Sequence, residues 1–341
     1  MKIRPESGSD PESLVIAPQW IGDAVMTEPL LRRLRARGER LTVGALPWVA
    51  PVYRAMPQVD AVIEFPFQHG GLQLKARRSL AQQVHGRFDI AYILPNSLKS
   101  SLLPFLAGIP KRVGYLGEAR VGLLTHRLKN PTNKPPMVAF YSALSGDKEG
   151  LEHDRPQLQL DGALVDAALH AQGLERGGYF VFAPGAEFGP AKRWPAVHFA
   201  QLARLLDRPV VLLGSGKEAT LCEEIAAGAS SGRCINLAGK TALAEAFAII
   251  SAARAVISND SGLMHVAAAF SAPQVALFGS SSPLHTPPLN EQARVLWLKD
   301  EPGYQPPLDC SPCFQRDCPL GHTRCLVDLM PERVLAALAS T

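Results

Sequence analysis

Short apolar segments alternate with amphipathic segments along most of the chain. In the first half, apolar runs rich in β-branched residues predict buried strands. These strands are expected at residues 14–18, 41–46, 60–65 and 89–95. Residues 72–86 have the amphipathic pattern of a helix. This alternation of strands and helices indicates a parallel sheet covered by helices.

The second half repeats this pattern more clearly, because each predicted strand ends in a Gly, Ser or Asp turn that opens a helix. Strands are expected at residues 179–185, 209–216, 255–260 and 273–281. Helices are expected at residues 194–207, 217–228, 242–253 and 261–270. Residues 330–341 predict a terminal helix with Pro331 at its start. The second half therefore predicts a second α/β domain.

The boundary between the two halves is expected near residues 160–178, because residues 151–178 contain no strong buried strand. We expect an N-terminal domain over residues 1–168, with residues 1–13 as a loose polar extension, and a C-terminal domain over residues 169–341. The predicted fold class is α/β, with two Rossmann-like domains whose parallel sheets face each other across a cleft.

Composition and charge fit this organisation. A chain of 341 residues suits two domains of ordinary size. The net charge of +4 divides into +6 for residues 1–165 (21 Lys and Arg against 15 Asp and Glu) and −2 for the remainder. The first half is thus the better candidate for an anionic partner, although a solvated basic surface explains the charge equally well. A nucleic-acid binder is disfavoured by the small net charge and by an aromatic content of 7%.

Membrane and targeting signals are missing from the sequence. No apolar run approaches the roughly 20 residues that span a bilayer, and the first residues contain no apolar signal region. We therefore expect a cytoplasmic protein.

Ligands of open parallel sheets bind beyond the carboxyl ends of the strands, so the strand-to-helix turns are the informative positions. In residues 255–270, Ser261 and Gly262 begin a helix whose N–H groups suit a phosphate. Asp260 and His265 could then bind sugar hydroxyls. The alternative is that Asp260 or Ser261 is only a helix cap and that His265 lies on the helix surface.

Three further turns of the second half carry small and polar residues. Lys192 stands near a Gly- and Pro-rich loop, where it could neutralise a diphosphate or simply flank a helix start. The remaining candidates, which suit a nucleoside, are Gly214, Ser215, Glu218, Lys240 and Thr241. Together these turns predict a nucleotide pocket.

Asp23 is the acidic residue in the first strand-to-helix turn. The fold would direct it into the cleft, where it could act as a general base within hydrogen-bond reach of a hydroxyl. A helix cap is the alternative. Because Pro29 disfavours a helix interior, regular helix is expected to begin nearer Thr27, which would leave Asp23 in a looser turn.

Other common site types are not matched. The first turn reads PQWIGD, not GxGxxG, and no GxxxxGK[ST] is present, which disfavours a dinucleotide dehydrogenase and a P-loop ATPase. The spacing of four clustered cysteines differs from the usual paired CxxC knuckles and leaves two readings open, a metal site or free thiols. These cysteines are Cys310, Cys313, Cys318 and Cys325.

Four long motifs resemble the bacterial lipopolysaccharide heptosyltransferases, glycosyltransferase family 9. They are PQWIGDAVMTEPLLRRL, PGAEFGPAKRWP, NDSGLMHVAAAFSAPQVALFGSSSPLHTPP and CFQRDCPLGHTRCL. The resemblance runs from about Leu14 to the C-terminus. The departure is RPESGSDPES near the start, which we expect to be a disordered and functionally silent insertion.

The resemblance implies a GT-B fold, with ADP-heptose bound by the C-terminal domain and a lipid acceptor by the N-terminal domain. It implies an inverting displacement with no cofactor and no required metal. Asp23 would be the base, Lys192 would contact the diphosphate, and Asp260 and His265 would hold the donor heptose. Ser261 and Gly262 would offer N–H groups to the phosphates.

The implied acceptor is lipid A–Kdo–heptose at the cytoplasmic face of the inner membrane, which implies peripheral membrane contact. The weaker candidates for acceptor contacts are Arg32, Arg33, Lys75, Arg77 and Arg78. Two alternatives stay open. One is an enzyme of the same family that acts one sugar earlier, on Kdo₂-lipid A. The other is a non-catalytic protein that binds a sugar nucleotide.

Overall fold

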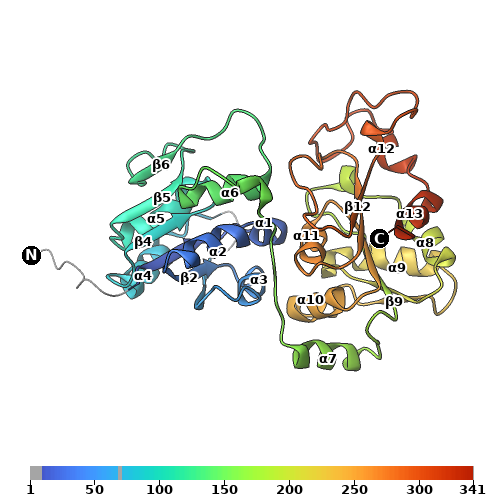
Figure 1. Ribbon diagram of the computed structural model, residues 1–341, viewed down its shortest axis with the longest axis horizontal. Coiled ribbons are helices and arrows are strands. Elements are labelled where there is room, and N and C mark those ends of the chain that lie inside the picture. Colours follow the sequence, from blue (N-terminus) through green and yellow to red (C-terminus); the bar gives the residue numbers. More distant parts are fainter. Residues whose placement is uncertain (1–9, 68–70, 341) are drawn as a thin grey trace, which may run out of the picture. The chain divides into compact units, whose positions relative to one another are not determined.

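The computed structural model describes residues 10–67 and 71–340, and the contacts within it divide the chain into two compact units. The first ends at Asp154 and the second begins at Arg155, ahead of the expected boundary at residue 168. Helix α7 (Gly162–Ala171) contacts α10 (Leu243–Ser251) and so belongs to the second unit. Figure 1 shows the elements of each unit.

A parallel sheet forms the centre of the first unit, in the strand order β3-β2-β1-β4-β5-β6. Its strands are β1 (Glu12–Ile16), β2 (Arg40–Ala45), β3 (Ala61–Glu64), β4 (Ile90–Ile93), β5 (Lys111–Tyr115) and β6 (His126–Leu128). Its helices are α1 (Ile21–Met26), α2 (Glu28–Ala36), α3 (Ala50–Arg54), α4 (Leu74–Val84), α5 (Leu98–Leu106) and α6 (Met137–Ser142), followed by the 3₁₀ turns η1 (Ala143–Ser145) and η2 (Leu151–His153).

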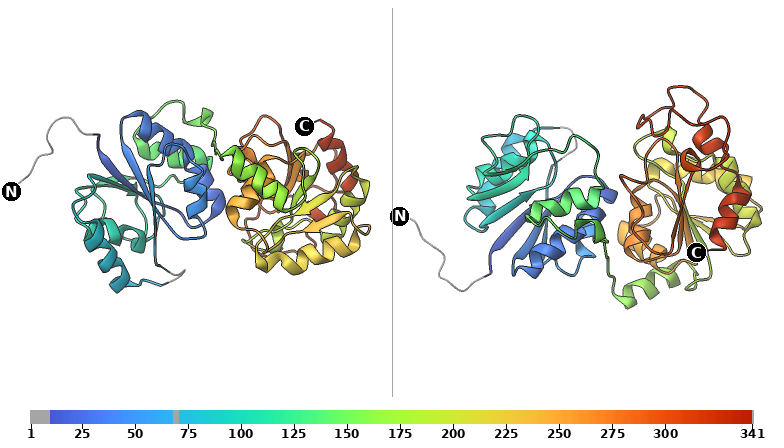
Figure 2. Two further views of the ribbon diagram at one scale, coloured as in Figure 1. Left: turned by 90° about the horizontal axis from the view of Figure 1, so that it is seen from below. Right: turned by 45° about the horizontal axis from the view of Figure 1, so that its top comes forward.

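Helices cover both faces of this sheet. Helices α1, α2, α3 and α6 contact one another, and α4 contacts α5 on the opposite face (Figure 2). The central strand β1 contributes Leu14, Val15 and Ile16, each at most 4% exposed. A strand that is buried on both faces carries a continuous apolar run, which is why the sequence pattern revealed it.

The second unit repeats this plan with the order β12-β11-β10-β7-β8-β9. Its strands are β7 (Phe180–Ala183), β8 (Val210–Leu212), β9 (Cys234–Asn236), β10 (Ala255–Asn259), β11 (Gln274–Phe278) and β12 (Ala293–Trp297). Its other helices are α8 (Ala196–Leu205), α9 (Ala219–Gly228), α11 (Gly262–Ala269), α12 (Arg324–Val327) and α13 (Pro331–Leu338), with the 3₁₀ turns η3 (Pro190–Lys192), η4 (Gly216–Glu218) and η5 (Leu298–Asp300). The predicted α/β class with two parallel sheets is confirmed.

The first strand begins earlier than expected, because β1 starts at Glu12 inside the segment predicted to be loose. Ser13 is fully buried, and its hydroxyl donates to Glu39 over 2.6 Å. The backbone N–H of Glu12 donates to Asp89 over 3.0 Å. These partners allow polar residues to extend the strand. Residues 1–9 of the predicted extension lie outside the described residues.

None of the helices in the described part of the chain has the length and apolar character needed to cross a membrane.

Candidate active site

The first unit has a pocket at the point where the strand order of its sheet reverses. Strands β1 and β4 are neighbours, and the later strands are added outward from them on opposite sides. Ligands of such sheets bind at this point, beyond the carboxyl ends of the strands. A pocket of about 680 Å³ lies there. The residues that line it are Pro18, Gln19, Trp20, Asp23, Leu72, Pro95, Asn96, Ser97, Leu98, Lys99, Glu118 and Tyr141.

Asp23 lies in this pocket but not in the looser turn that the sequence predicted. It occupies the first turn of α1, whose N-cap residue is Trp20. Pro29 interrupts the helix as expected, but it does so by starting α2, and Thr27 joins the two helices. Asp23 is therefore not the N-cap residue of α1, and its side chain is partly exposed.

Tyr141 from α6 holds the Asp23 carboxylate. Its hydroxyl donates to Asp23 Oδ1 over 3.2 Å. Burial raises the pKa of Tyr141 well above its usual value, and the nearby charge of Asp23 raises it further. The phenol therefore stays neutral and keeps its proton for the hydrogen bond. The carboxylate is thus oriented by a neutral donor, an arrangement that suits a proton acceptor.

Arg33 and Arg77, two candidates for acceptor contacts, are already engaged within their own unit. Arg33 donates to Asp154 over 2.7 Å and to Asp147 over 3.2 Å, which fastens the segment before the boundary onto α2. Arg77 is 7% exposed, stacks on the ring of Phe67 at 4.2 Å and donates to the carbonyl of Leu72 over 2.8 Å. Both side chains stabilise the fold.

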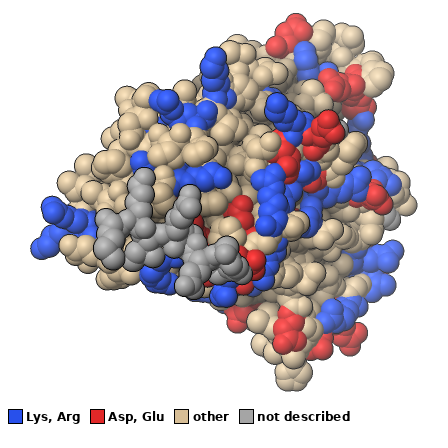
Figure 3. All heavy atoms as spheres, turned by 60° about the vertical axis from the view of Figure 1, so that its left-hand side comes forward, with Lys and Arg blue, Asp and Glu red and all other residues tan. Residues whose placement is uncertain are grey.

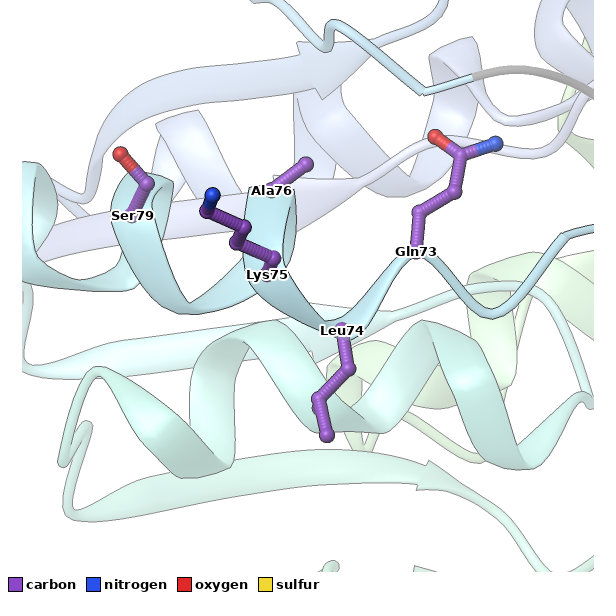
Figure 4. A pocket seen from close by; sticks show the side chains of 5 residues that line it. All are labelled: Gln73, Leu74, Lys75, Ala76 and Ser79. Carbon is purple, nitrogen blue, oxygen red and sulfur yellow. The ribbon is translucent and has the colours of Figure 1, made fainter.

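The other three basic candidates face solvent. The Arg32 side chain is 40% exposed and forms a pair with Glu28 at 3.3 Å. Lys75 and Arg78 are exposed on α4. Lys75 also lines a shallow hollow at the start of α4, where its side chain and that of Leu74 point in different directions (Figure 4). On the face drawn in Figure 3, basic and acidic side chains are interleaved.

The second unit has an ion pair at the equivalent point of its sheet, between the ends of β7 and β10. Lys192, in the turn that follows β7, donates to Asp260 Oδ2 over 2.5 Å. The Asp260 side chain is 5% exposed and that of Lys192 is 19% exposed. Thr286 donates to the second Asp260 oxygen over 3.4 Å. The structure thus brings together two residues that the sequence analysis found in separate turns.

The start of α11 lies beside this ion pair. Ser261 is the N-cap residue, and both Ser261 and Gly262 are partly exposed. The N–H groups at such a helix start suit an anion. His265 is 5% exposed, so it is not the surface residue of the alternative reading. Burial lowers the pKa of His265 to about 4, and the imidazole is therefore neutral near pH 7.

The nucleoside candidates lie in two loops that contact each other. The N–H of Gly239, next to Lys240, donates to the carbonyl of Gly214 over 2.9 Å. Lys240 is exposed, and its ammonium donates to the carbonyl of Asn236 over 3.0 Å. Thr241 is partly exposed. The two loops therefore form one surface at the carboxyl ends of β8 and β9.

Glu218 has a structural role in this loop. Its Oε2 accepts from the N–H of Ser215 over 2.7 Å and from the hydroxyl of Ser215 over 2.5 Å. Together they form a capping box at the start of η4. This role argues against Glu218 as a ribose ligand.

Sequence reasoning missed Tyr141 and Asn259. Tyr141 belongs to α6, a segment with no distinctive motif, and only the folded chain brings it to Asp23. The Asn259 side chain accepts from the N–H of Trp194 over 3.0 Å and donates to the carbonyl of Pro184 over 2.7 Å, which ties the loop after β7 to the end of β10. An Asn that ends an apolar run was a usable sequence signal for Asn259.

All four clustered cysteines lie within the described residues. Within the described residues, no group of three or more His, Cys, Asp or Glu side chains is arranged to hold a metal ion. Cys310, Cys313, Cys318 and Cys325 are free thiols in the structure. Burial raises the pKa of Cys325 to about 11. Burial also acts to raise the pKa of Cys318. Backbone N–H groups that bond the Cys318 sulfur, including that of Thr323, outweigh this effect, and the pKa is lowered overall.

Comparison with known proteins identifies the family. The model of glycosyltransferase family 9 (heptosyltransferase) matches residues 77–323. The chain is 42% identical to lipopolysaccharide heptosyltransferase 2 of Escherichia coli (strain K12), over 95% of this chain and 97% of that protein. It is 36% identical to lipooligosaccharide heptosyltransferase 2 of Haemophilus influenzae, over 95% and 97% of the two chains.

A solved structure supports the same assignment. The structure of E. coli ADP-heptose LPS heptosyltransferase II matches with a TM-score of 0.81 and 39% identity, over 96% of this chain and 98% of that chain. The GT-B type of fold that the sequence resemblance implied is thereby confirmed. The sequence motifs, the two parallel sheets and these matches agree, and this chain belongs to glycosyltransferase family 9, the heptosyltransferases.

Proposed function

We propose that this protein transfers L-glycero-D-manno-heptose from ADP-heptose to the first heptose of the lipopolysaccharide inner core, heptosyl-Kdo₂-lipid A. The observation that carries the proposal is the Asp23 carboxylate, held by the neutral Tyr141 in the pocket at the carboxyl ends of β1 and β4. The names of the relatives that match nearly the whole chain support this choice of reaction.

In the proposed reaction, Asp23 accepts the proton of an acceptor hydroxyl as its oxygen attacks the anomeric carbon of the donor. The bond from that carbon to the phosphate oxygen breaks, and ADP leaves with the electron pair. One displacement inverts the anomeric configuration. A positioned general base contributes roughly 10²- to 10⁴-fold to the rate of such a step.

The second unit supplies groups for the negative charge on the departing ADP. Lys192 and the N–H groups at Ser261 and Gly262 are proposed to contact the diphosphate. Because Lys192 is paired with Asp260 in the described state, the ammonium is already held at the place where charge would develop. Asp260 and the neutral His265 are proposed to bind hydroxyls of the donor heptose.

The nucleoside is proposed to lie on the loops that contain Gly214, Ser215, Lys240 and Thr241. These loops contact each other and lie at the same edge of the sheet as Lys192. Glu218 is omitted because its carboxylate caps η4.

The acceptor is proposed to bind in the Asp23 pocket. Lys99 lines the pocket, Lys75 and Arg78 are exposed, and Arg32 is partly exposed. These cations suit the phosphates and carboxylates of a lipid core or an anionic membrane surface. Arg33 and Arg77 are left out because they stabilise their own unit. Peripheral contact with the cytoplasmic face of the inner membrane follows from a lipid-anchored acceptor.

The test is transfer from ADP-heptose to two acceptors, Kdo₂-lipid A and heptosyl-Kdo₂-lipid A, followed by mass spectrometry. We expect one added heptose on the second acceptor and none on the first. Addition to Kdo₂-lipid A alone would mean that the protein acts one sugar earlier. Binding of ADP-heptose without transfer to either acceptor would favour a sugar-nucleotide-binding protein.

A further inference from the structure

Arg120 is a buried charged side chain that bonds two residues lining the Asp23 pocket, Pro95 and Asn96. It is 0% exposed, and its guanidinium donates to neutral oxygens of the main chain and of side chains. The guanidinium donates to the carbonyl of Tyr115 over 2.9 Å, to the carbonyl of Pro95 over 2.6 Å and to the side-chain oxygen of Asn96 over 2.8 Å. One guanidinium therefore joins the end of β5 to the loop after β4.

This burial is costly for an arginine. Moving a cation out of water is unfavourable unless the surrounding groups replace its hydration. Burial lowers the pKa of Arg120 to about 10, and the nearby Glu118 acts in the opposite direction. The guanidinium still remains charged near neutral pH. Its planar fork satisfies several carbonyl oxygens at once, which a lysine ammonium cannot reproduce.

The segment before Arg120 has an unusual backbone. Glu118 and Ala119 both have positive φ, of 41° and 55°, a region that residues other than glycine rarely adopt. The Glu118 carboxylate accepts from the N–H of Leu98 over 2.8 Å, at the start of α5. Glu118 and Arg120 thus hold the same loop after β4 from two points.

This loop forms one wall of the Asp23 pocket. Pro95, Asn96 and Leu98, which bond to Arg120 or Glu118, line the pocket together with Asp23 and Tyr141. Asn96 also donates to Asn130 over 3.0 Å, so its side chain is fixed on both of its polar atoms. The position of the wall therefore depends on the clamp formed by Glu118 and Arg120.

We propose that Arg120 is a positioning residue for the acceptor. It holds the loop of residues 95–99 at the distance from Asp23 that lets a sugar hydroxyl reach the carboxylate. It does not touch the substrate, because its side chain is fully buried. The kinetic part of this inference rests on the proposed function, and the structural part does not.

The test compares Arg120→Lys with Arg112→Lys. Arg112 is a matched control, since it lies in the same unit and also donates to backbone carbonyls, those of Leu123 and Ile109, each over 2.6 Å. It does not line the pocket in the described structure. Both variants are assayed in the full chain.

The first readout is amide hydrogen exchange without any substrate. We expect exchange of residues 96–99 to become at least about 10-fold faster in Arg120→Lys and to be unchanged in Arg112→Lys. Equal protection of this loop in Arg120→Lys and the wild type would overturn the clamp, whatever the protein transfers.

The second readout is steady-state transfer. We expect the KM for heptosyl-Kdo₂-lipid A to rise about 10-fold or more in Arg120→Lys, with the KM for ADP-heptose within about twofold of the wild type. An equal rise in both KM values would indicate a general structural defect and would overturn the positioning role. Absence of transfer by the wild type would count against the proposed function alone.

If Arg120→Lys does not fold, Asn96→Ala replaces it. This variant removes the bond between Arg120 and the Asn96 side chain and leaves the buried guanidinium with its carbonyl partners. We expect the same pattern of faster exchange and raised acceptor KM. Unchanged exchange and an unchanged acceptor KM in Asn96→Ala would overturn the inference.

Discussion

The two units have the same strand order but place different chemistry at the point where the order changes direction. In the first unit, the carboxylate of Asp23 accepts from a neutral phenol in a pocket. In the second unit, the carboxylate of Asp260 is buried and paired with the ammonium of Lys192 at 2.5 Å. The same scaffold thus carries two carboxylates that bind different groups, a phenol and an ammonium.

From this difference we infer different tasks for the two carboxylates. The hydroxyl of Tyr141 is a neutral donor, and its hydrogen bond orients the Asp23 carboxylate as a proton acceptor requires. Asp260 is paired with a cation, and its carboxylate oxygens are suited to accept hydrogen bonds from hydroxyls. We therefore place the proton transfer in the first unit and the charge stabilisation in the second.

Replacement of Asp23 should have the largest effect. In Asp23→Asn, kcat should fall roughly 10²- to 10⁴-fold, because the amide cannot accept the proton. The dissociation constant of ADP-heptose should not change. Asp89→Asn is the control, since Asp89 directly precedes β4 and lies at the amino ends of the strands, whereas Asp23 lies at their carboxyl ends. Full turnover in Asp23→Asn would show that the proton goes elsewhere.

Replacement of Lys192 should weaken both turnover and stability. In Lys192→Gln, loss of the cation should lower kcat about 10²- to 10³-fold. It should also destabilise the protein by about 3–5 kcal/mol in urea unfolding, because Asp260 keeps a buried charge. The double variant with Asp260→Asn should regain stability without regaining activity.

A control from the same domain separates this effect from general loss of charge. Lys217 forms an ion pair with Glu187 at 2.7 Å, with both side chains exposed. We expect Lys217→Gln to unfold in urea much as the wild type does, because exposed ion pairs contribute little to stability. A similar loss of activity in Lys217→Gln and Lys192→Gln would contradict a specific role for Lys192.

Acid should destabilise the protein through His265. Its pKa falls from 6.5 to about 4 on folding, so the unfolded state takes up the proton first as the pH decreases. The contribution of the neutral His265 to the free energy of unfolding, roughly 3 kcal/mol, is fully present above pH 6.5 and is lost as the pH falls towards and below 4. His198, whose pKa burial also lowers, acts in the same direction.

Urea unfolding between pH 7.5 and 4.5 measures this dependence. His265→Gln should show a weaker loss of stability with falling pH than the wild type, and the exposed His170→Gln should match the wild type. If the free energy of unfolding fell equally with pH in His265→Gln and in the wild type, His265 would not be a buried neutral imidazole.

Removal of the Tyr141 hydroxyl should have the smallest effect on turnover. In Tyr141→Phe, kcat should fall about 10-fold, because one hydrogen bond to a charged group is lost. The acid limb of the pH–rate profile should move to higher pH, since the ionised carboxylate loses a donor. Tyr53→Phe, which loses a bond to Thr27, should leave that limb in place.

The sequence predicted the central strands and the edge strand β3 well, but it held no strong signal for β5, β6, β9 and β12. Strands β1, β7 and β10 are buried on both faces and read as continuous apolar runs. Strands β5 and β6 contain Lys, Arg and His, and β9 and β12 are only partly buried, so their patterns resemble loops. Such strands gain much of their stability from backbone bonds to a neighbouring strand, which no local pattern reports.

The sequence predicted the place in the fold of those candidate residues that a single turn carries, and their roles stay proposals. Asp23, Lys192, Asp260 and His265 all follow strand ends, as expected for a ligand at a parallel sheet. Arg120 lies after β5 and bonds Asn96 in the loop after β4, which lines the Asp23 pocket. The ion pair between Arg33 and Asp154 joins residues more than a hundred positions apart. Such distant partners cannot be derived from one sequence without the fold.

The most direct test of the account is a crystal structure of the protein with heptosyl-Kdo₂-lipid A bound. The account predicts that a hydroxyl of the terminal heptose lies within about 2.6–3.2 Å of an Asp23 carboxylate oxygen, while Tyr141 donates to that carboxylate. An acceptor bound with all its hydroxyls out of reach of Asp23 would contradict the central claim.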